Sequence, residues 1–284
     1  MITLIASLML SVPPQVVEAP VPPACIGETF VSWSACAQAA AEGTPVYSLA
    51  MMNLGTEAYV QGNLPGALNY YDKSELPGHS ITSDAVFHAF RGDARRYGGR
   101  MTEAQADAII AWGFLSGKPP AGTPAEMVQP LDDSLRTMVL SIILPILKDG
   151  DPQAFALARA MYMALPAEDW LALSQRAGTL ASLGEYEAAV GASKRALDLQ
   201  PNDPLTQNNH CYTLATAGRA AEGLAYCESA VAALPEMAPV RQSYATALAA
   251  LGRCADAEIQ ILEARRLEPA GALYREPLNC RQNP

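Results

Sequence analysis

The stretch LGEYEAAVGASKRALDLQPNDP, Leu183–Pro204, decides the fold, because three of its residues return downstream at one fixed spacing. A glycine, an alanine and a proline each recur after 34 residues and again after another 34. The three series are Gly184, Gly218 and Gly252; Ala196, Ala230 and Ala264; and Pro201, Pro235 and Pro269. Three markers that keep one period across three copies indicate an internal structural repeat.

One copy of the repeat contains two short helices joined by a turn. Residues 170–183 place apolar side chains near one face of a helix. Gly184 ends this helix, because glycine adopts the left-handed conformation of a helix C-terminus at little cost. Ala189 and Ala196 lie in the second helix, where a large side chain would push the two helices apart.

The second helix is followed by a stop signal. Pro201 cannot be absorbed into a helix interior, and Asn202 and Asp203 offer oxygens that cap the next helix. The composition also favours helices, since the apolar surplus is mostly alanine and strictly alternating β-branched clusters are scarce. The sequence therefore predicts an all-α protein built from helix pairs.

This pattern resembles the tetratricopeptide repeat, with glycine at repeat position 15, small residues at 20 and 27, and proline at 32. A weaker copy keeps the frame at Gly150 but has Phe155 and Tyr162 at the two small positions. The resemblance implies an all-α, right-handed solenoid of stacked helix-turn-helix pairs. The expected segments are a signal peptide at 1–19, a proline-rich segment with a short capping helix at 20–47, two degenerate repeats at 48–118, a linker at 119–135, four repeats at 136–271 and a capping tail at 272–284.

In this family the first helix of each pair lines a concave groove, so the resemblance also implies where a partner binds. Asn and Gln amides both donate and accept hydrogen bonds, so they can pair with the backbone of an extended peptide of any sequence. The alternative is that these amides only solvate an open face. The Lys and Arg pattern by which chaperone-binding relatives hold a C-terminal carboxylate is missing. The expected groove residues are Gln175, Asn208, Asn209, Tyr212, Gln242 and Thr246, with Ser174, Thr216 and Ser243 beside them.

The same repeat frame places the cysteines. Positions 8 and 24 of a copy face each other across the helix pair in this family, and one copy has cysteine at both. Cys254 begins the second helix of the last copy, and a tail that folds back would bring Cys280 to it. Each disulfide would close a short loop and so contribute about 3 kcal/mol of stability. The alternative is that the six cysteines are reduced, as in a cytosolic protein. The implied disulfides are Cys211–Cys227, Cys254–Cys280 and, for the two that remain, Cys25–Cys36.

The N-terminus predicts export. An apolar run at Ile2–Val12 is too short to span a bilayer but suits a secretory signal, and Val17-Glu18-Ala19 offers a small-residue cleavage pattern. Two features argue against a signal: no Lys or Arg precedes the run, and Pro20 would follow the cut. A lipoprotein that begins at Cys25 and a cytoplasmic protein remain as alternatives. No transmembrane helix is expected in the mature chain.

The charge argues against a nucleic-acid partner. The formal net charge is −10, whereas phosphate binding calls for clustered Lys and Arg. One local cluster of arginines could hold an anion, but Asp93 interrupts it, and a solvated helix face is the preferred interpretation. The four arginines of this cluster are Arg91, Arg95, Arg96 and Arg100.

The sequence also lacks enzymatic motifs. It has no paired-cysteine zinc spacing, no nucleophile-elbow motif and no phosphate-binding glycine loop. Its histidines, His79, His88 and His210, are scattered in the repeat frame, so a structural or surface role is expected for each. Neither catalysis, nor a metal, nor a cofactor is expected.

Taken with the resemblance, these observations predict an exported, non-enzymatic adaptor that binds a protein or peptide in the groove, in the periplasm or envelope of a bacterium. One alternative is a purely structural or oligomerisation module whose groove has no ligand. Another is a lipid-anchored factor of envelope assembly. An open concave face with accessible amides favours the adaptor, and a groove filled by the chain's own tail favours the structural module.

Overall fold

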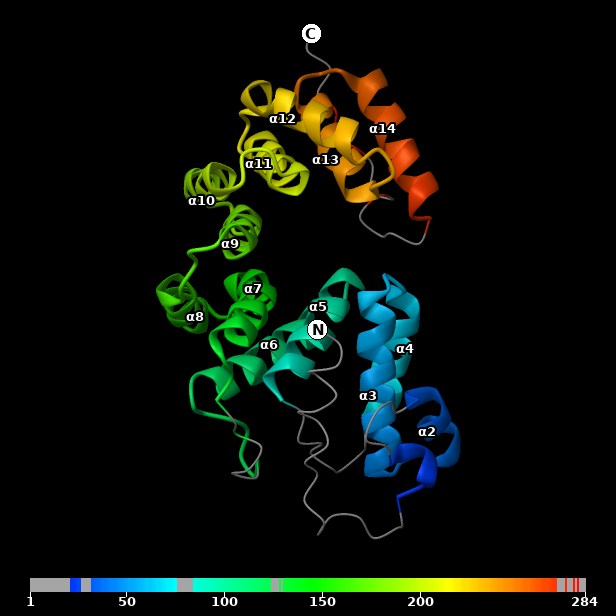
Figure 1. Ribbon diagram of the computed structural model, residues 1–284. Helices are drawn as coiled ribbons and strands as arrows, with labels where there is room; N and C mark the ends of the chain where they lie inside the picture. Colours follow the sequence, from blue (N-terminus) through cyan, green and yellow to red (C-terminus); the bar gives the residue numbers. More distant parts are fainter. Residues whose placement is uncertain are drawn as a thin grey trace. The chain divides into compact units, whose positions relative to one another are not determined.

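The computed structural model describes residues 21–26, 32–75, 84–123, 128, 130–269, 274, 278 and 280. These residues form thirteen α-helices and one short 3-10 helix, and no strand is found among them (Figure 1). The expected all-α fold is therefore confirmed. The expected signal segment at 1–19 lies outside the described residues. None of the helices in the described part is both long and apolar enough to cross a bilayer.

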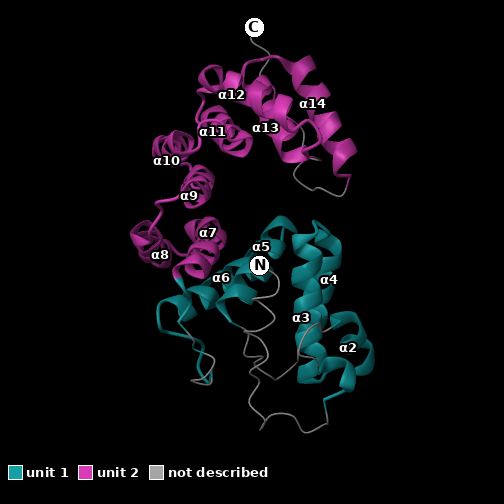
Figure 2. Ribbon diagram, viewed as in Figure 1, with its two compact units in different colours: residues 1–132 teal, residues 133–284 magenta. Residues whose placement is uncertain are grey.

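The chain divides into two compact units, residues 1–132 and 133–284 (Figure 2). The boundary falls in the segment 119–135, where the sequence predicts a linker. Unit 1 contains two helix pairs, which turn at Gly62 and Gly99 with φ angles of +77° and +76°. Its elements are η1 (Pro23–Cys25), α2 (Trp33–Ala39), α3 (Pro45–Val60), α4 (Leu64–Ser74), α5 (Ala85–Tyr97) and α6 (Met101–Leu115).

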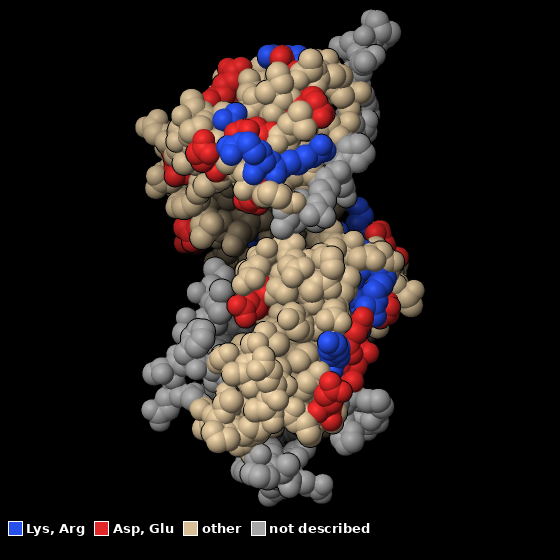
Figure 3. Space-filling view, turned by 90° about the vertical axis from the view of Figure 1, so that its right-hand side faces the viewer, with Lys and Arg blue, Asp and Glu red and all other residues tan. Residues whose placement is uncertain are grey.

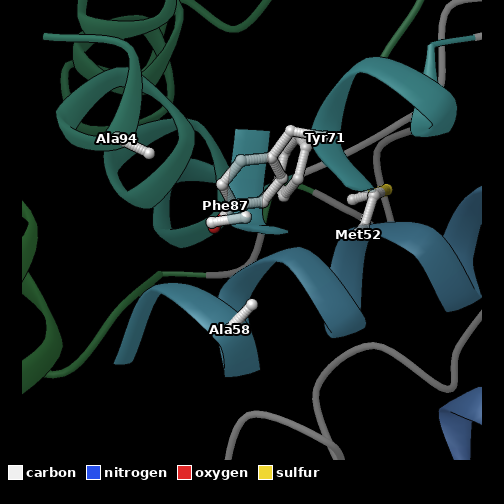
Figure 4. Close-up of a cluster of buried hydrophobic side chains, with 6 residues drawn as sticks. Met52, Ala58, Tyr71, Phe87 and Ala94 are labelled. Carbon is white, nitrogen blue, oxygen red and sulfur yellow. The ribbon is translucent and has the colours of Figure 1, made fainter. Parts of the chain in front are cut away.

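The apolar core of unit 1 lies between α3, α4 and α5 (Figure 4). The rings of Tyr71 and Phe87 meet edge to face with centroids 5.7 Å apart, and the Tyr71 hydroxyl donates to Thr56 Oγ1 at 3.2 Å. A Cβ atom at Gly55 would lie 2.6 Å from the Tyr71 ring, so a larger residue does not fit there. Gly55 and Tyr71 thus form a close contact that holds α3 against α4.

Unit 2 is a row of four helix pairs. The first helices of consecutive pairs contact one another, and the second helices α10 and α12 also pack against the first helix that follows them (Figure 1). Stacking of this kind buries apolar faces that no single pair can bury alone. The elements are α7 (Asp133–Gly150), α8 (Pro152–Ala164), α9 (Trp170–Ser182), α10 (Tyr186–Leu199), α11 (Pro204–Thr216), α12 (Ala220–Ala233), α13 (Ala238–Ala250) and α14 (Cys254–Leu267).

The turn glycines behave as the repeat predicts. Gly184, Gly218 and Gly252 have φ angles of +75°, +77° and +74°, and each stands between the two helices of a pair. Ala196 is 1% exposed, as expected for a residue at the helix contact. Asp203 caps α11 by accepting a hydrogen bond from the backbone N–H of Thr206 at 2.8 Å. The predictions for these residues are confirmed.

The weaker copy at 136–169 differs at its turn. Gly150 is the last residue of α7 and lacks the positive φ of the other turn glycines. Asp151 makes the turn instead, because its carboxylate accepts hydrogen bonds from the backbone N–H groups of Gln153 and Ala154. Tyr162, at a position expected to be small, is fully buried, and its hydroxyl donates to Thr179 Oγ1 of α9 at 3.0 Å.

The end of unit 2 is covered by residues that follow α14. Tyr274 packs against a cluster that includes Ala238 and Ile261, and Leu278 packs beside it. Arg265 Nε also donates to the Tyr274 carbonyl oxygen at 2.5 Å. The described residues of the tail therefore contact α13 and α14, at the end of the row where a further repeat would stack.

Candidate functional site

The exposed side of the first helices in unit 2 forms a regular surface, which we call the first-helix face. Residues spaced i, i+4, i+7 and i+11 lie on one side of a helix. On α9 all four residues of this stripe are exposed, and on α11 all four are exposed or half-buried. On α13 three are exposed or half-buried, and Ser243 is buried. The face consists of Leu171, Gln175, Gly178 and Ser182 on α9; Leu205, Asn209, Tyr212 and Thr216 on α11; and Pro239, Ser243, Thr246 and Ala250 on α13.

Four of the six residues expected to bind a partner belong to this face. Gln175 is exposed, and Asn209, Tyr212 and Thr246 are half-buried. Gln242, also half-buried, is a neighbour of the stripe, and its Nε2 donates to Thr246 Oγ1 at 3.5 Å. The structure thus brings these five side chains together along three adjacent helices.

Asn208 differs from the expectation of an accessible amide. It is 7% exposed, because it precedes Asn209 by one residue and so points about 100° away around the helix axis. Ser174, at the same repeat position in α9, is buried for the same reason. The resemblance implied that both line the groove, but the helix turns these two side chains away from the open side.

Two buried polar atoms near the face have no hydrogen-bond partner among the described residues. They are Ser174 Oγ and Asn208 Oδ1. Asn208 Nδ2 does donate to Asn209 Oδ1 at 3.3 Å, so only one side of its amide is satisfied. An unsatisfied buried group costs about 1–3 kcal/mol and is unusual enough to need an explanation. Both atoms lie on the helices whose neighbouring residues form the face.

The first-helix face carries no charge. None of its twelve residues is Lys, Arg, Asp, Glu or His, although the formal net charge of the chain is −10. Elsewhere on unit 2, exposed arginines pair with acids three residues away, such as Arg219 with Glu222 and Arg253 with Asp256. Figure 3 shows such side chains of opposite sign next to one another. The face therefore offers hydrogen bonds and apolar contacts rather than ion pairs.

Sequence reasoning missed the apolar part of this face. Leu171 and Leu205 are 50% and 37% exposed and occupy the same repeat position on α9 and α11. Pro239 stands at that position on α13. The signal was present in the spacing, because each of these residues lies four before the next member of its stripe. Selection by polar residue type passed over them.

The arginine cluster of unit 1 is an internal ion network. Arg91 Nη2 and Arg95 Nη1 each donate to Asp107 of α6 at 2.7 Å, and His88 Nδ1 lies 2.7 Å from the same carboxylate. Arg95 is 4% exposed and Asp107 1%. The interpretation of these arginines as a solvated helix face is therefore wrong for this pair, because a carboxylate of the neighbouring helix draws them inward.

The other two arginines of the cluster also have carboxylate partners. Arg96 Nη2 lies 2.6 Å from Asp93, and Arg100 Nη1 lies 2.7 Å from Asp72. Both arginines are half-buried rather than freely solvated. These ion pairs connect residues within unit 1 and leave the cluster poorly suited to hold an external anion.

The network keeps Asp107 ionised. Burial alone would raise the pKa of this carboxyl, but hydrogen bonds from His88 and Arg91 outweigh it and lower the pKa to about 2. Burial lowers the pKa of His88, and this effect exceeds the opposite effect of the Asp107 carboxylate, which raises it. The cluster thus joins α5 to α6 through a charge that persists at all ordinary pH values, which is a structural role.

His210 has a structural environment rather than the geometry of a ligand-binding site. His210 is buried between helices, with Nδ1 2.9 Å from Ser193 Oγ and its ring edge-on to Tyr226. His79 lies outside the described residues. In the part of the chain that the structure describes, no three His, Cys, Asp or Glu side chains gather as a metal site would require.

The cysteine pairs of the structure are those implied by the repeat frame. One pair joins α11 to α12 within a single copy, one ties the tail to α14, and one ties η1 to α2. All six cysteines are used in this way. The pairs and their Cα–Cα distances are Cys211–Cys227 at 5.5 Å, Cys254–Cys280 at 5.7 Å and Cys25–Cys36 at 4.7 Å.

Several solved structures are similar to this chain. A tetratricopeptide repeat protein from Parabacteroides merdae is similar over 82% of this chain and 86% of its own, with 15% identity and a TM-score of 0.53. MamA from Desulfovibrio magneticus covers 47% of this chain and 76% of its own, with 22% identity and a TM-score of 0.34. YrrB, a tetratricopeptide protein described as having an unusual peptide-binding site, covers 80% and 89%, with 15% identity and a TM-score of 0.34.

No protein-family model and no curated protein matches the sequence. The structural similarity to the Parabacteroides protein extends over most of the chain. It agrees with the period of 34 residues, the glycine turns and the row of stacked helix pairs. The chain has the helical-repeat fold of tetratricopeptide repeat proteins, as its sequence predicts.

Proposed function

We propose that this protein is an interaction scaffold that binds an extended segment of a partner protein on the first-helix face of unit 2. The observation that carries the proposal is the composition of that face. It combines an apolar row at Leu171, Leu205 and Pro239 with amides and hydroxyls next to it, and it contains no charge. Such a surface suits a neutral peptide backbone with apolar side chains.

Hydrogen bonding explains why an extended chain is the fitting ligand. The amides of Gln175, Asn209 and Gln242 stand on three successive helices, and each offers both a donor and an acceptor. An extended backbone presents its own N–H and C=O groups at regular intervals, so one strand of peptide can meet all three amides. A folded partner surface offers fewer free backbone groups.

We further propose that the scaffold acts outside the cytoplasm, in the periplasm or cell envelope of a bacterium. The three cysteine pairs support this proposal, because disulfides form and persist in oxidising compartments. The partner would then be an exported protein. The scaffold is proposed to work without catalysis and without a nucleic-acid partner.

The rival proposal is a structural module in which the chain's own tail occupies the face. The described tail residues instead pack on the far end of unit 2, where Tyr274 contacts α13 and α14. This placement favours a capping role for the tail. It therefore supports the scaffold over the rival.

The test is capture of a partner from the cell envelope by the disulfide-bonded protein. Asn209→Ala combined with Gln242→Ala removes two amides and should weaken capture at least about tenfold, since each hydrogen bond contributes roughly 1 kcal/mol. Gln200→Ala, which removes an exposed amide at the end of α10, is the matched control. Undiminished capture by the double variant, with an unchanged melting temperature, would refute binding at this face.

A further inference from the structure

Gly178 is a glycine that the fold itself does not explain. It lies in the interior of α9, and glycine is unfavourable there relative to alanine. Its φ angle is in the ordinary helical range, so no left-handed turn requires it. A Cβ atom added to Gly178 would meet nothing within 4 Å.

Two other helical glycines, Gly55 and Gly223, do have a packing reason. A Cβ at Gly55 would lie 2.6 Å from the Tyr71 ring, and one at Gly223 would lie 3.1 Å from the Cys211 carbonyl oxygen. These two glycines allow neighbouring helices to approach. Gly178 has open space where those two have close contacts, so no packing contact requires a glycine there. We call the gap that its missing side chain leaves in the stripe the notch.

The notch lies within the first-helix face. Gly178 shares its stripe with Gln175 three residues before it and Ser182 four residues after it. The same repeat position holds Tyr212 on α11 and Thr246 on α13, so the row of side chains across the helices has a gap on α9 alone of these three. The uncharged gap therefore has Gln175 and Ser182 as its neighbours along α9, and Tyr212 at the same repeat position on α11.

We propose that Gly178 is the floor of a subsite that accepts a large apolar side chain of the bound peptide. This inference rests on the proposed function and adds the chemistry of the ligand: an uncharged, extended segment with one large aliphatic or aromatic residue. The absence of a side chain at residue 178 lets the ligand approach the helix backbone closely. Burial of that apolar side chain beside Tyr212 and the neighbouring leucines supplies the affinity.

The test begins with selection of binders from a random nonapeptide library displayed on phage, with the full disulfide-bonded chain as bait. The selected sequences should be free of charge and should share a large apolar residue. A synthetic copy of one binder is then compared with a copy in which that residue is alanine. Wild-type protein should bind the apolar peptide about 10–100-fold more tightly, the value of one buried apolar side chain.

Gly178→Gln fills the notch with a neutral side chain, and Gly191→Gln is its control. Gly191 is also exposed in a helix interior, on α10, and a Cβ there also meets nothing within 4 Å. Both variants should raise the melting temperature by about 2–4 °C, because each replaces a helical glycine. Only Gly178→Gln should abolish the preference for the apolar peptide over its alanine copy.

The outcomes separate this inference from the proposed function. If Gly178→Gln keeps the preference, or if the two glycine variants lose it equally, the subsite is refuted. Selection of charged peptides would also refute it, while loss of binding in Asn209→Ala with Gln242→Ala would still support the face as the binding site. Failure to select any peptide would count against both.

Discussion

Asp107→Asn tests the buried ion network of unit 1. The substitution keeps the size of the side chain but removes the charge that Arg91 and Arg95 contact at 2.7 Å. Arg95 is 4% exposed, so its guanidinium is shielded from water in the folded protein. Removing one partner of a buried ion pair typically destabilises a protein by about 3–5 kcal/mol. Arg91 and Arg95 keep the more exposed carboxylate of Glu75 as a partner, so we expect a loss at the lower end of this range, about 3 kcal/mol.

Urea unfolding followed by circular dichroism measures this loss. A change of about 3 kcal/mol is a large share of the roughly 5–15 kcal/mol that stabilises a typical domain. Glu222→Gln is the control, because this glutamate pairs with Arg219 at an exposed site where ion pairs have little effect. A change below about 1 kcal/mol for Asp107→Asn would refute the view that the network stabilises unit 1.

The same carboxylate predicts an acid dependence of stability. Its folded pKa of about 2 is below the usual value of about 3.9 for an unfolded aspartate, so its contribution is fully present above pH 4. That contribution is lost as the pH falls from about 4 to about 2. Asp107→Asn should lack this part of the acid-induced loss, and identical pH profiles of the variant and the wild type would contradict the assignment.

Three further predictions concern packing and disulfides. Ala196→Leu should destabilise the protein by about 1–3 kcal/mol through overpacking, and a neutral result in thermal unfolding would place this residue away from the helix contact. Gly55→Ala should lower the melting temperature, because its Cβ would lie 2.6 Å from the Tyr71 ring, and an unchanged melting point would contradict this close contact. Protein made in an oxidising compartment should show no free thiols, with Cys211 linked to Cys227 in peptide maps. A different partner for Cys211 would mean that the repeat register is misplaced.

The regular copies could be predicted from the sequence because their markers act locally. Gly184 ends a helix through its own backbone freedom, and Asp203 caps the helix that begins at the next residue. Neither effect needs a distant partner. Gly150 shows the limit of this reasoning. It is the last residue of α7 and not a turn glycine, because Asp151 caps α8 and Pro152 begins it.

The arginine network and the binding face depend on information that residue type does not contain. Arg95 points inward because Asp107 lies on the neighbouring helix, and the sequence does not state which faces of two helices meet. Asn208 and Asn209 are alike in type, yet one is buried and the other lies on the face. Only the helix geometry separates them. Gly178 and Gly191 both have open space at the Cβ position, and only Gly178 lies on the first-helix face.

The most direct test of binding at the first-helix face is site-specific photo-crosslinking in the envelope of the source cell. A benzophenone amino acid is placed at Gln175, exposed on the face, or at Arg195, exposed on α10. We predict that illumination joins a partner protein to the chain labelled at 175 and leaves the chain labelled at 195 unlinked. A partner joined at 195 and absent at 175 would contradict binding at this face.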